Sequence, residues 1–155
     1  MGQLTLVGQY HYQRTVGDGG NTDPRLTYSG APGRRARALS VRLDYQRGPW
    51  SVSGNYTRIT RTGRFLFPRE WGREPFYTFL PREREESFGG LDAAILLANY
   101  AVPAVPGLKA EASYGRYYLP DVKDFRLNKY GMPSYSQLNA WLSYPFRSWA
   151  KGLRG

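Results

Sequence analysis

Apolar and polar residues alternate with a period of two along six segments of the chain. In the first segment, the even positions from Leu4 to Tyr12 form one face, and the odd positions from Thr5 to His11 form the other. Successive side chains of a β-strand point to opposite faces, so this pattern predicts strands. Each segment has about ten residues, the length with which a tilted strand crosses a bilayer. The predicted strands are 3–13, 35–46, 50–58, 91–101, 108–118 and 134–146.

The prolines support this assignment. All eleven lie between the segments or at their ends, because proline cannot donate a hydrogen bond to a β-ladder. The connections alternate between long polar loops and tight turns at 47–49 and 102–107. Membrane barrels have this asymmetry, with long extracellular loops and short periplasmic turns. We therefore predict an all-β fold, in which residues 1–155 form one partial domain: an antiparallel transmembrane β-barrel fragment of six up-and-down strands.

The fourth segment fits the pattern least well. Residues 91–102 are rich in helix formers and lack clean alternation, so propensity alone leaves a short helix open. Its place between a long loop and the turn at 102–107 requires a strand. With Tyr100 facing outward, Ile95, Leu97 and Asn99 would face inward.

Aromatic residues gather at the ends of the predicted strands. Those toward the long loops are Tyr10, Tyr12, Tyr56, Tyr114 and Tyr118, and those toward the turns are Tyr45, Trp50, Tyr100, Tyr144 and Phe146. Two aromatic girdles are typical of the two membrane interfaces. Tyrosine also ends strands in soluble β-proteins, so a soluble barrel or sandwich binding module stays open. That fold would reverse the faces and bury Leu39, Val41 and Leu43.

Composition and charge narrow the classes of function. The chain is 41% hydrophobic and has no run of the about 18–20 apolar residues that a spanning helix needs. Its net charge of +10 is compatible with nucleic-acid binding, but the basic and aromatic residues do not share one sheet face. The excess arginine lies in loops and turns, where anionic lipid or nearby glutamates would neutralise it. We predict no nucleic-acid partner.

Catalysis is not expected. His11 is the single histidine, and the chain has no nucleophile elbow and no metal-ligand spacing. An outer-membrane barrel enzyme of the phospholipase kind stays open as an alternative, but it would need a His–Ser pair on the lipid face, whereas His11 lies opposite Tyr10 and Tyr12. We predict no enzyme activity, no metal and no cofactor.

The inward faces of the strands carry the residues expected to line a channel: His11, Ser40, Arg42, Asp44, Asn55, Lys109, Glu111, Tyr117 and Asn139. Arg42 and Asp44 are two residues apart on one strand, as are Lys109 and Glu111. Opposite charges in an aqueous lumen create a transverse field that can orient a zwitterion. The alternative is that they form cross-strand ion pairs that fix the register of the wall.

The longest loop contains the most specific motif. Residues 68–73 read Pro-Arg-Glu-Trp-Gly-Arg, and residues 78–84 read Thr-Phe-Leu-Pro-Arg-Glu-Arg. Together with residues 127–139, Leu-Asn-Lys-Tyr-Gly-Met-Pro-Ser-Tyr-Ser-Gln-Leu-Asn, and with Lys-Gly-Leu at 151–153, these runs resemble the outer-membrane porin D (OprD) family of substrate-specific porins. Residues 1–59 match that family only in pattern.

The resemblance implies an eighteen-stranded, monomeric barrel with a narrow pore for small carboxylate-bearing solutes such as amino acids. This chain would supply strands eleven to sixteen. The loop at 60–87 would fold inward and narrow the pore, with constriction residues Arg69, Glu70, Arg73, Glu74, Tyr77 and Arg82. The family's pore wall has a ladder of basic residues, of which only Arg42 and Lys109 can be placed here.

These features together predict an internal piece of a larger porin in the outer membrane, since the first strand pattern begins almost at Met1 and a seventh strand begins near residue 153. The expected partners are outer-membrane lipid, lipopolysaccharide and small anionic or zwitterionic solutes.

Overall fold

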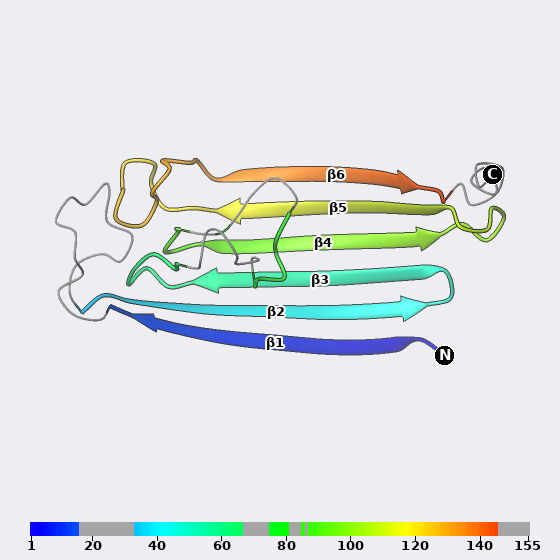
Figure 1. The fold of residues 1–155 in the computed structure, drawn as a ribbon, viewed down its shortest axis with the longest axis horizontal. Helices are drawn as coiled ribbons and strands as arrows, with labels where there is room; N and C mark the ends of the chain where they lie inside the picture. The colour runs from blue at the N-terminus through cyan, green and yellow to red at the C-terminus, as the bar shows by residue number, and fades with distance from the viewer. Residues whose placement is uncertain (16–32, 67–74, 81–84, 86, 146–155) are drawn as a thin grey trace, which may run out of the picture.

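The chain forms one antiparallel sheet in the computed structural model, which describes residues 1–15, 33–66, 75–80, 85 and 87–145. Its strands follow one another in sequence order, each paired with the next (Figure 1). They are β1 (Gln3–Arg14), β2 (Arg35–Arg47), β3 (Trp50–Ile59), β4 (Asp92–Ala101), β5 (Lys109–Tyr118) and β6 (Tyr135–Ser143). The all-β, six-stranded, up-and-down prediction is therefore confirmed. β1 and β6 are the edges of the sheet, which is not closed.

The predicted strand limits agree with the structure to within one residue, except at the end of the sixth strand. That strand ends at Ser143 rather than at residue 146, because Pro145 cannot donate to the ladder. The helix alternative for residues 91–102 is wrong. β4 pairs with β3 and β5 along its whole length, with Leu97 opposite Ser113 and Asn99 opposite Glu111.

Tight turns join the strands at one end of the sheet, and the long connections lie at the other end (Figure 1). Only Gly48 and Pro49 separate β2 from β3. Gly48 has φ 55, and a positive φ at the first turn position is what a type II′ hairpin requires. Between β4 and β5, the amide of Val102 donates to the Leu108 carbonyl at 3.0 Å and closes the second turn.

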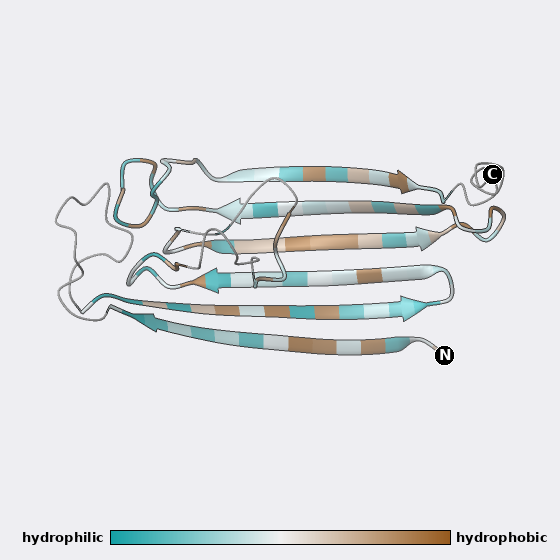
Figure 2. Ribbon diagram, viewed as in Figure 1, coloured by the Kyte–Doolittle hydropathy of each residue, from teal (hydrophilic) through white to brown (hydrophobic). Residues whose placement is uncertain are grey.

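The register sorts the side chains onto two faces, because residues directly opposite one another in an antiparallel sheet point to the same side. We call the face with Leu6, Leu43 and Leu96 the loop-free face. Its large apolar side chains are exposed, with Leu6 at 74%, Leu138 at 74% and Leu142 at 73%. Figure 2 shows brown and teal residues alternating along several strands, most plainly β2.

The opposite face carries the long connection between β3 and β4, and we call it the loop-bearing face. The only buried apolar cluster of the described residues lies between this face and the connection, near the loop end of the sheet. Its members are Ala36, Ala38, Ile59, Phe65, Phe76, Leu80, Phe88, Leu91, Ala93, Ile95 and Tyr117. The loop-free face has no such covering layer among the described residues.

Candidate channel-lining face

The β3–β4 connection folds back over the loop-bearing face and bonds to side chains of four strands, β1, β2, β3 and β5. The amide of Leu66 donates to Gln13 Oε1 at 2.9 Å, and the amide of Tyr77 donates to Ser40 Oγ at 3.0 Å. The Tyr117 hydroxyl on β5 donates to the Thr78 carbonyl at 2.6 Å. Side-chain amides of β1 add bonds from Gln9 to the Pro75 carbonyl and from Gln13 to the Leu66 carbonyl. The described part of this loop therefore contacts side chains of the face that the sequence predicts to point inward.

Buried hydroxyl groups connect β2, β3 and the loop in one hydrogen-bonded chain. Ser40 Oγ lies 2.7 Å from Thr57 Oγ1, and Thr57 Oγ1 lies 2.6 Å from Thr78 Oγ1. Thr78 also bonds to the carboxyl group of Glu85. Each of these hydroxyl groups has one proton and can also accept, so Thr57 links Ser40 on β2 to Thr78 in the loop. Ser40 Oγ also accepts from the Tyr77 amide, which satisfies the beginning of the chain.

Aromatic packing covers His11 at the loop end of β1. The imidazole lies edge-on to Phe65 with 5.7 Å between ring centroids and to Phe76 with 5.8 Å. Both phenylalanines belong to the β3–β4 connection and are buried. His11 therefore packs against the loop rather than facing open solvent.

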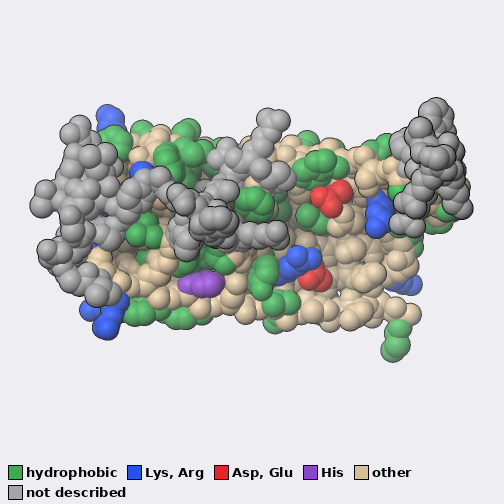
Figure 3. All heavy atoms as spheres, viewed as in Figure 1, with side chains coloured by type: hydrophobic (Ala, Val, Ile, Leu, Met, Phe, Trp, Pro, Cys, Tyr) green, Lys and Arg blue, Asp and Glu red, His purple; other side chains and the backbone are tan. Residues whose placement is uncertain are grey.

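Charged side chains occupy the half of the face nearer the turns, which the described part of the loop leaves open (Figure 3). Arg42 Nε donates to both oxygens of Asp44, at 2.7 and 2.8 Å. This pair lies along one strand, so it does not fix the register between strands. Lys109 and Glu111 share the face with it, and they form no ion pair among the described residues.

All nine residues predicted to line a channel lie on the loop-bearing face, and the register brings them to one side of the sheet. The structure divides them into two groups. The first group lies on the open part of the face: Arg42 and Lys109 are exposed, and Asp44, Glu111 and Asn139 are half-buried. The second group lies beneath the loop or among neighbouring side chains: His11 is half-buried, and Ser40, Asn55 and Tyr117 are buried.

Of the predicted constriction residues, Tyr77 is described: it is half-buried and its amide bonds to the wall. Arg69, Glu70, Arg73, Glu74 and Arg82 lie outside the described residues.

The sequence interpretation missed the residues that hold the loop in place. Gln9, Gln13 and Thr57 lie on the inward side of the same alternation that identified Ser40, so the pattern contained that signal. Thr78 and Glu85 lie in the loop, where no periodicity indicates which side chains turn toward the sheet.

A second loop braces the first. In the β5–β6 connection, the buried Asn128 amide donates to the carbonyls of Pro120 at 3.0 Å and Met132 at 2.7 Å. Asn128 also accepts from the Met132 amide at 3.0 Å. The amide of Gly89 in the β3–β4 connection donates to the Leu127 carbonyl at 2.8 Å. The two long connections therefore hold each other at the loop end of the sheet.

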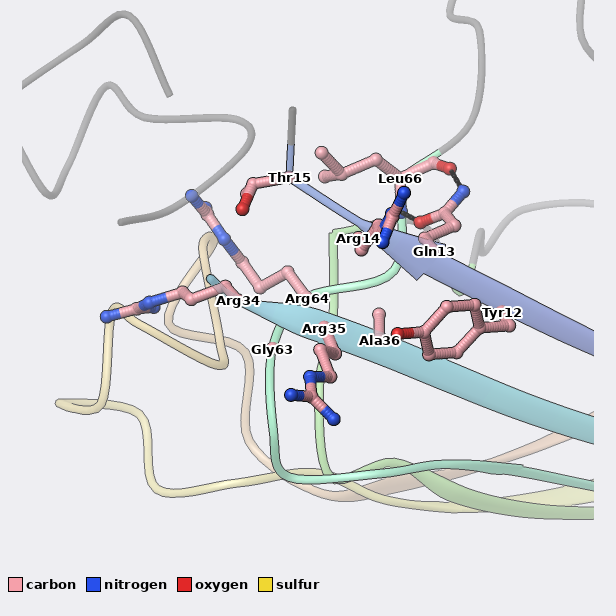
Figure 4. A pocket seen from close by; sticks show the side chains of 10 residues that line it. All are labelled: Tyr12, Gln13, Arg14, Thr15, Arg34, Arg35, Ala36, Gly63, Arg64 and Leu66. Atoms are coloured by element: carbon pink, nitrogen blue, oxygen red, sulfur yellow. Dashed lines mark hydrogen bonds between the residues drawn. The ribbon is translucent and has the colours of Figure 1, made fainter. Parts of the chain in front are cut away.

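A basic pocket of about 430 Å³ lies at the loop ends of β1 and β2. Figure 4 shows its lining side chains. Four are arginines: Arg14, Arg34, Arg35 and Arg64. Such a concentration of positive charge attracts anionic groups. Among the described residues, no cluster of three His, Cys, Asp or Glu side chains could hold a metal ion.

Comparisons with known proteins leave the resemblance to the OprD family as a hypothesis. No family model matches the chain, and neither the curated proteins nor the solved structures give a significant match. The described residues contain no helix long and apolar enough to cross a membrane.

Proposed function

We propose that this chain forms part of the wall of an outer-membrane porin that passes small carboxylate-bearing solutes, with amino acids as the favoured class. The observation that carries the proposal is the contrast between the two faces: six strands expose an apolar face, and the long loop covers part of the polar one. A membrane barrel has this arrangement, with apolar residues toward lipid and polar residues toward the lumen.

The apolar face is larger than the apolar patches that soluble monomers usually expose. Leu4, Leu6, Leu39, Leu43, Leu96, Leu138 and Leu142 are all exposed on it. Soluble monomers rarely expose contiguous apolar patches beyond a few hundred Å². A soluble barrel or sandwich would bury these leucines and leave the Arg42 face in water, so its faces would be the reverse of those observed.

The charges of the open half suit a zwitterionic or anionic solute. Arg42 and Lys109 offer positive groups beside Asp44 and Glu111 on the loop-bearing face. Their opposite charges orient a solute that has both an amino and a carboxylate group. Arg34 and Arg64, which line the pocket at the loop end, add a positive potential that attracts carboxylates from outside. The motifs at 68–73 and 78–84, which resemble the OprD family, agree with this class of solute.

Cysteine labelling on one strand tests the orientation of the wall, since the chain has no cysteine of its own. Leu43 and Asp44 are neighbours on β2 and face opposite sides. In outer membranes, a small charged thiol reagent should modify Asp44→Cys through the aqueous lumen and leave Leu43→Cys unmodified. A fluorophore attached to Leu43→Cys should be quenched by brominated acyl chains. Modification of Leu43→Cys without lipid quenching would contradict the proposal.

A further inference from the structure

The tripeptide pattern Tyr-X-Arg occurs in four strands. Tyr45-Gln46-Arg47 ends β2 at the turn end of the sheet, and the other three copies lie in strands that run the opposite way. Tyr12-Gln13-Arg14 ends β1, Tyr56-Thr57-Arg58 lies near the end of β3, and Tyr114-Gly115-Arg116 lies in β5. All three strands run toward the loop end of the sheet (Figure 1). The first and third residues of each tripeptide point to the loop-free face. Each strand therefore places a tyrosine on that face and an arginine one step nearer the loops.

The register shows that the three copies are not level across the sheet. Tyr12 is opposite Arg37 on β2, whereas Tyr56 is opposite Val41, four residues nearer the turns. Through Ala94, Tyr56 lies in the same row as Arg116, so Tyr114 is a further two residues nearer the turns. From β1 to β5 the tyrosine therefore shifts six residues toward the turns, across four spacings between neighbouring strands.

This descent matches the tilt of strands in a membrane barrel. Six residues correspond to about 20 Å along a strand, and four spacings to about 19 Å across the sheet. The line through the tyrosines is therefore inclined by about 45° to the row direction, and strands in membrane barrels are tilted by about 35–45°. In a tilted wall the three tyrosines lie at one depth, and the three arginines lie together at the next depth outward. Tyr114, which lies opposite Leu96 and Leu138, then belongs to the outer girdle.

A fourth arginine lies on the same line. Arg14 is opposite Arg35, and Arg58 is opposite Leu39, so Arg37 falls midway on the intervening strand. We call Arg14, Arg37, Arg58 and Arg116 the arginine line; all four are exposed.

The arginine line carries an excess of positive charge and stands beside aromatic rings. The expectation that basic and aromatic residues do not share one sheet face is therefore wrong at the loop end, because the register brings both onto the loop-free face. The guanidinium groups of the line lie 5.9 Å from the Tyr12 ring for Arg37 and 5.1 Å from the Tyr118 ring for Arg116. Among the described strand residues of the loop-free face, Asp92 is the one acidic side chain, with an oxygen 3.8 Å from Arg58 Nε. Four positive charges face one negative charge.

We propose that the arginine line binds the phosphate groups of a phosphorylated glycolipid in the outer leaflet; this rests on the proposed membrane location of the wall. The order along each strand is apolar band, tyrosine and then arginine, which matches hydrocarbon, interface and headgroup. Arginine binds phosphate oxygens with two parallel hydrogen bonds. At the turn end, the described residues of the loop-free face offer only Arg47 on the strands, beside Trp50 and Tyr100. The site therefore belongs to the loop end.

Lipid binding tests this site directly. A complete barrel that contains this chain would be placed in phosphatidylcholine bilayers with either diphosphorylated lipid A or the same glycolipid without phosphates. We expect at least about tenfold tighter binding of the phosphorylated form, because each arginine–phosphate pair is charge-assisted. A variant with Arg14→Gln, Arg37→Gln, Arg58→Gln and Arg116→Gln should lose this preference. A control with the same charge change, Arg47→Gln, Lys109→Gln, Lys123→Gln and Arg126→Gln, should keep it.

Two results would overturn the inference: equal affinity of the parent barrel for the two lipids, or equal loss in both variants. Circular dichroism should show the same β-structure in both variants, so that a lost preference is not lost folding. A fluorophore on Leu43→Cys, with brominated acyl chains as quenchers, separates this inference from the proposed function. Quenching without a phosphate preference would reject the lipid site and leave the wall intact, whereas absent quenching would reject the membrane wall itself.

Discussion

The two faces of the sheet are made by the same six strands, yet they solve the problem of solvation in opposite ways. The loop-bearing face is mostly polar, and part of it is covered by a loop that brings its own phenylalanines and hydroxyl groups. The loop-free face is mostly apolar and has no cover among the described residues. A protein folding in water covers its apolar face first, because that burial is the main favourable contribution to folding. An uncovered apolar face is what the proposed contact with lipid would require.

A charge in the middle of the loop-free face gives the strongest test of the difference between the two faces. Leu43→Arg should lower the free energy of unfolding in bilayers by about 2–4 kcal/mol, since the guanidinium would enter hydrocarbon. Thr5→Arg is the matched control, because Thr5 is exposed on the loop-bearing face opposite Asp44. Denaturant unfolding in vesicles measures both. If Leu43→Arg left the free energy of unfolding unchanged, the loop-free face would meet water.

Two glycines test which face is closely packed. A Cβ on Gly115 would lie 2.9 Å from Leu80 Cδ1 and 3.0 Å from Tyr117 Cε2, whereas a Cβ on Gly54 meets nothing within 4 Å. Gly115→Ala should therefore destabilise the protein by about 1–3 kcal/mol through overpacking.

Gly54→Ala is the control on the loop-free face, and it should be neutral or stabilise by up to about 1 kcal/mol. Both effects would be measured as changes in the free energy of unfolding. If Gly115→Ala were as stable as Gly54→Ala, the loop would not pack against β5.

Adjacent tyrosines on β5 point to opposite faces and test which face the loop covers. Tyr117→Phe removes the hydrogen bond to the Thr78 carbonyl and leaves that buried acceptor with one partner fewer. We expect a loss of about 0.5–1.5 kcal/mol of stability and faster proteolysis within the β3–β4 connection. Tyr118→Phe, on the exposed face, should change neither. Equal effects of the two substitutions would contradict the assignment of faces.

The smallest expected effect on stability is that of Arg42→Gln. Its ion pair with Asp44 is exposed, and such pairs contribute about 0–1 kcal/mol. In a complete barrel that contains this chain, however, Asp44 would be left without its counter-charge, and the channel should become more cation-selective. The reversal potential in a salt gradient measures this shift. Arg126→Gln, which breaks a loop pair with Asp124, is the control; an equal shift there would remove Arg42 from the pore.

Much of this architecture could be predicted from the sequence because its signals are local. The alternation from Leu39 to Asp44 places leucine and valine on one side and Ser40, Arg42 and Asp44 on the other, whichever solvent each side meets. Proline at 49 and 103 marks the turns for the same local reason. The difficult fourth strand followed from connectivity, since a segment between a long loop and a tight turn must run back along the sheet to its turn end.

Contacts between residues distant in sequence decided the rest. The alternation predicts that His11, Ser40 and Arg42 all line a channel. In the structure the loop buries Ser40 and partly covers His11, while Arg42 stays open. Nothing local predicts that Thr78 and Glu85 complete a hydroxyl chain from β2, because their side chains belong to an irregular segment. Likewise the four Tyr-X-Arg copies are visible in the sequence, but the common depth of the three at the loop end depends on the register between strands. The period of two determined the faces of this protein; the long-range pairing and the returning loop decided what each face can bind.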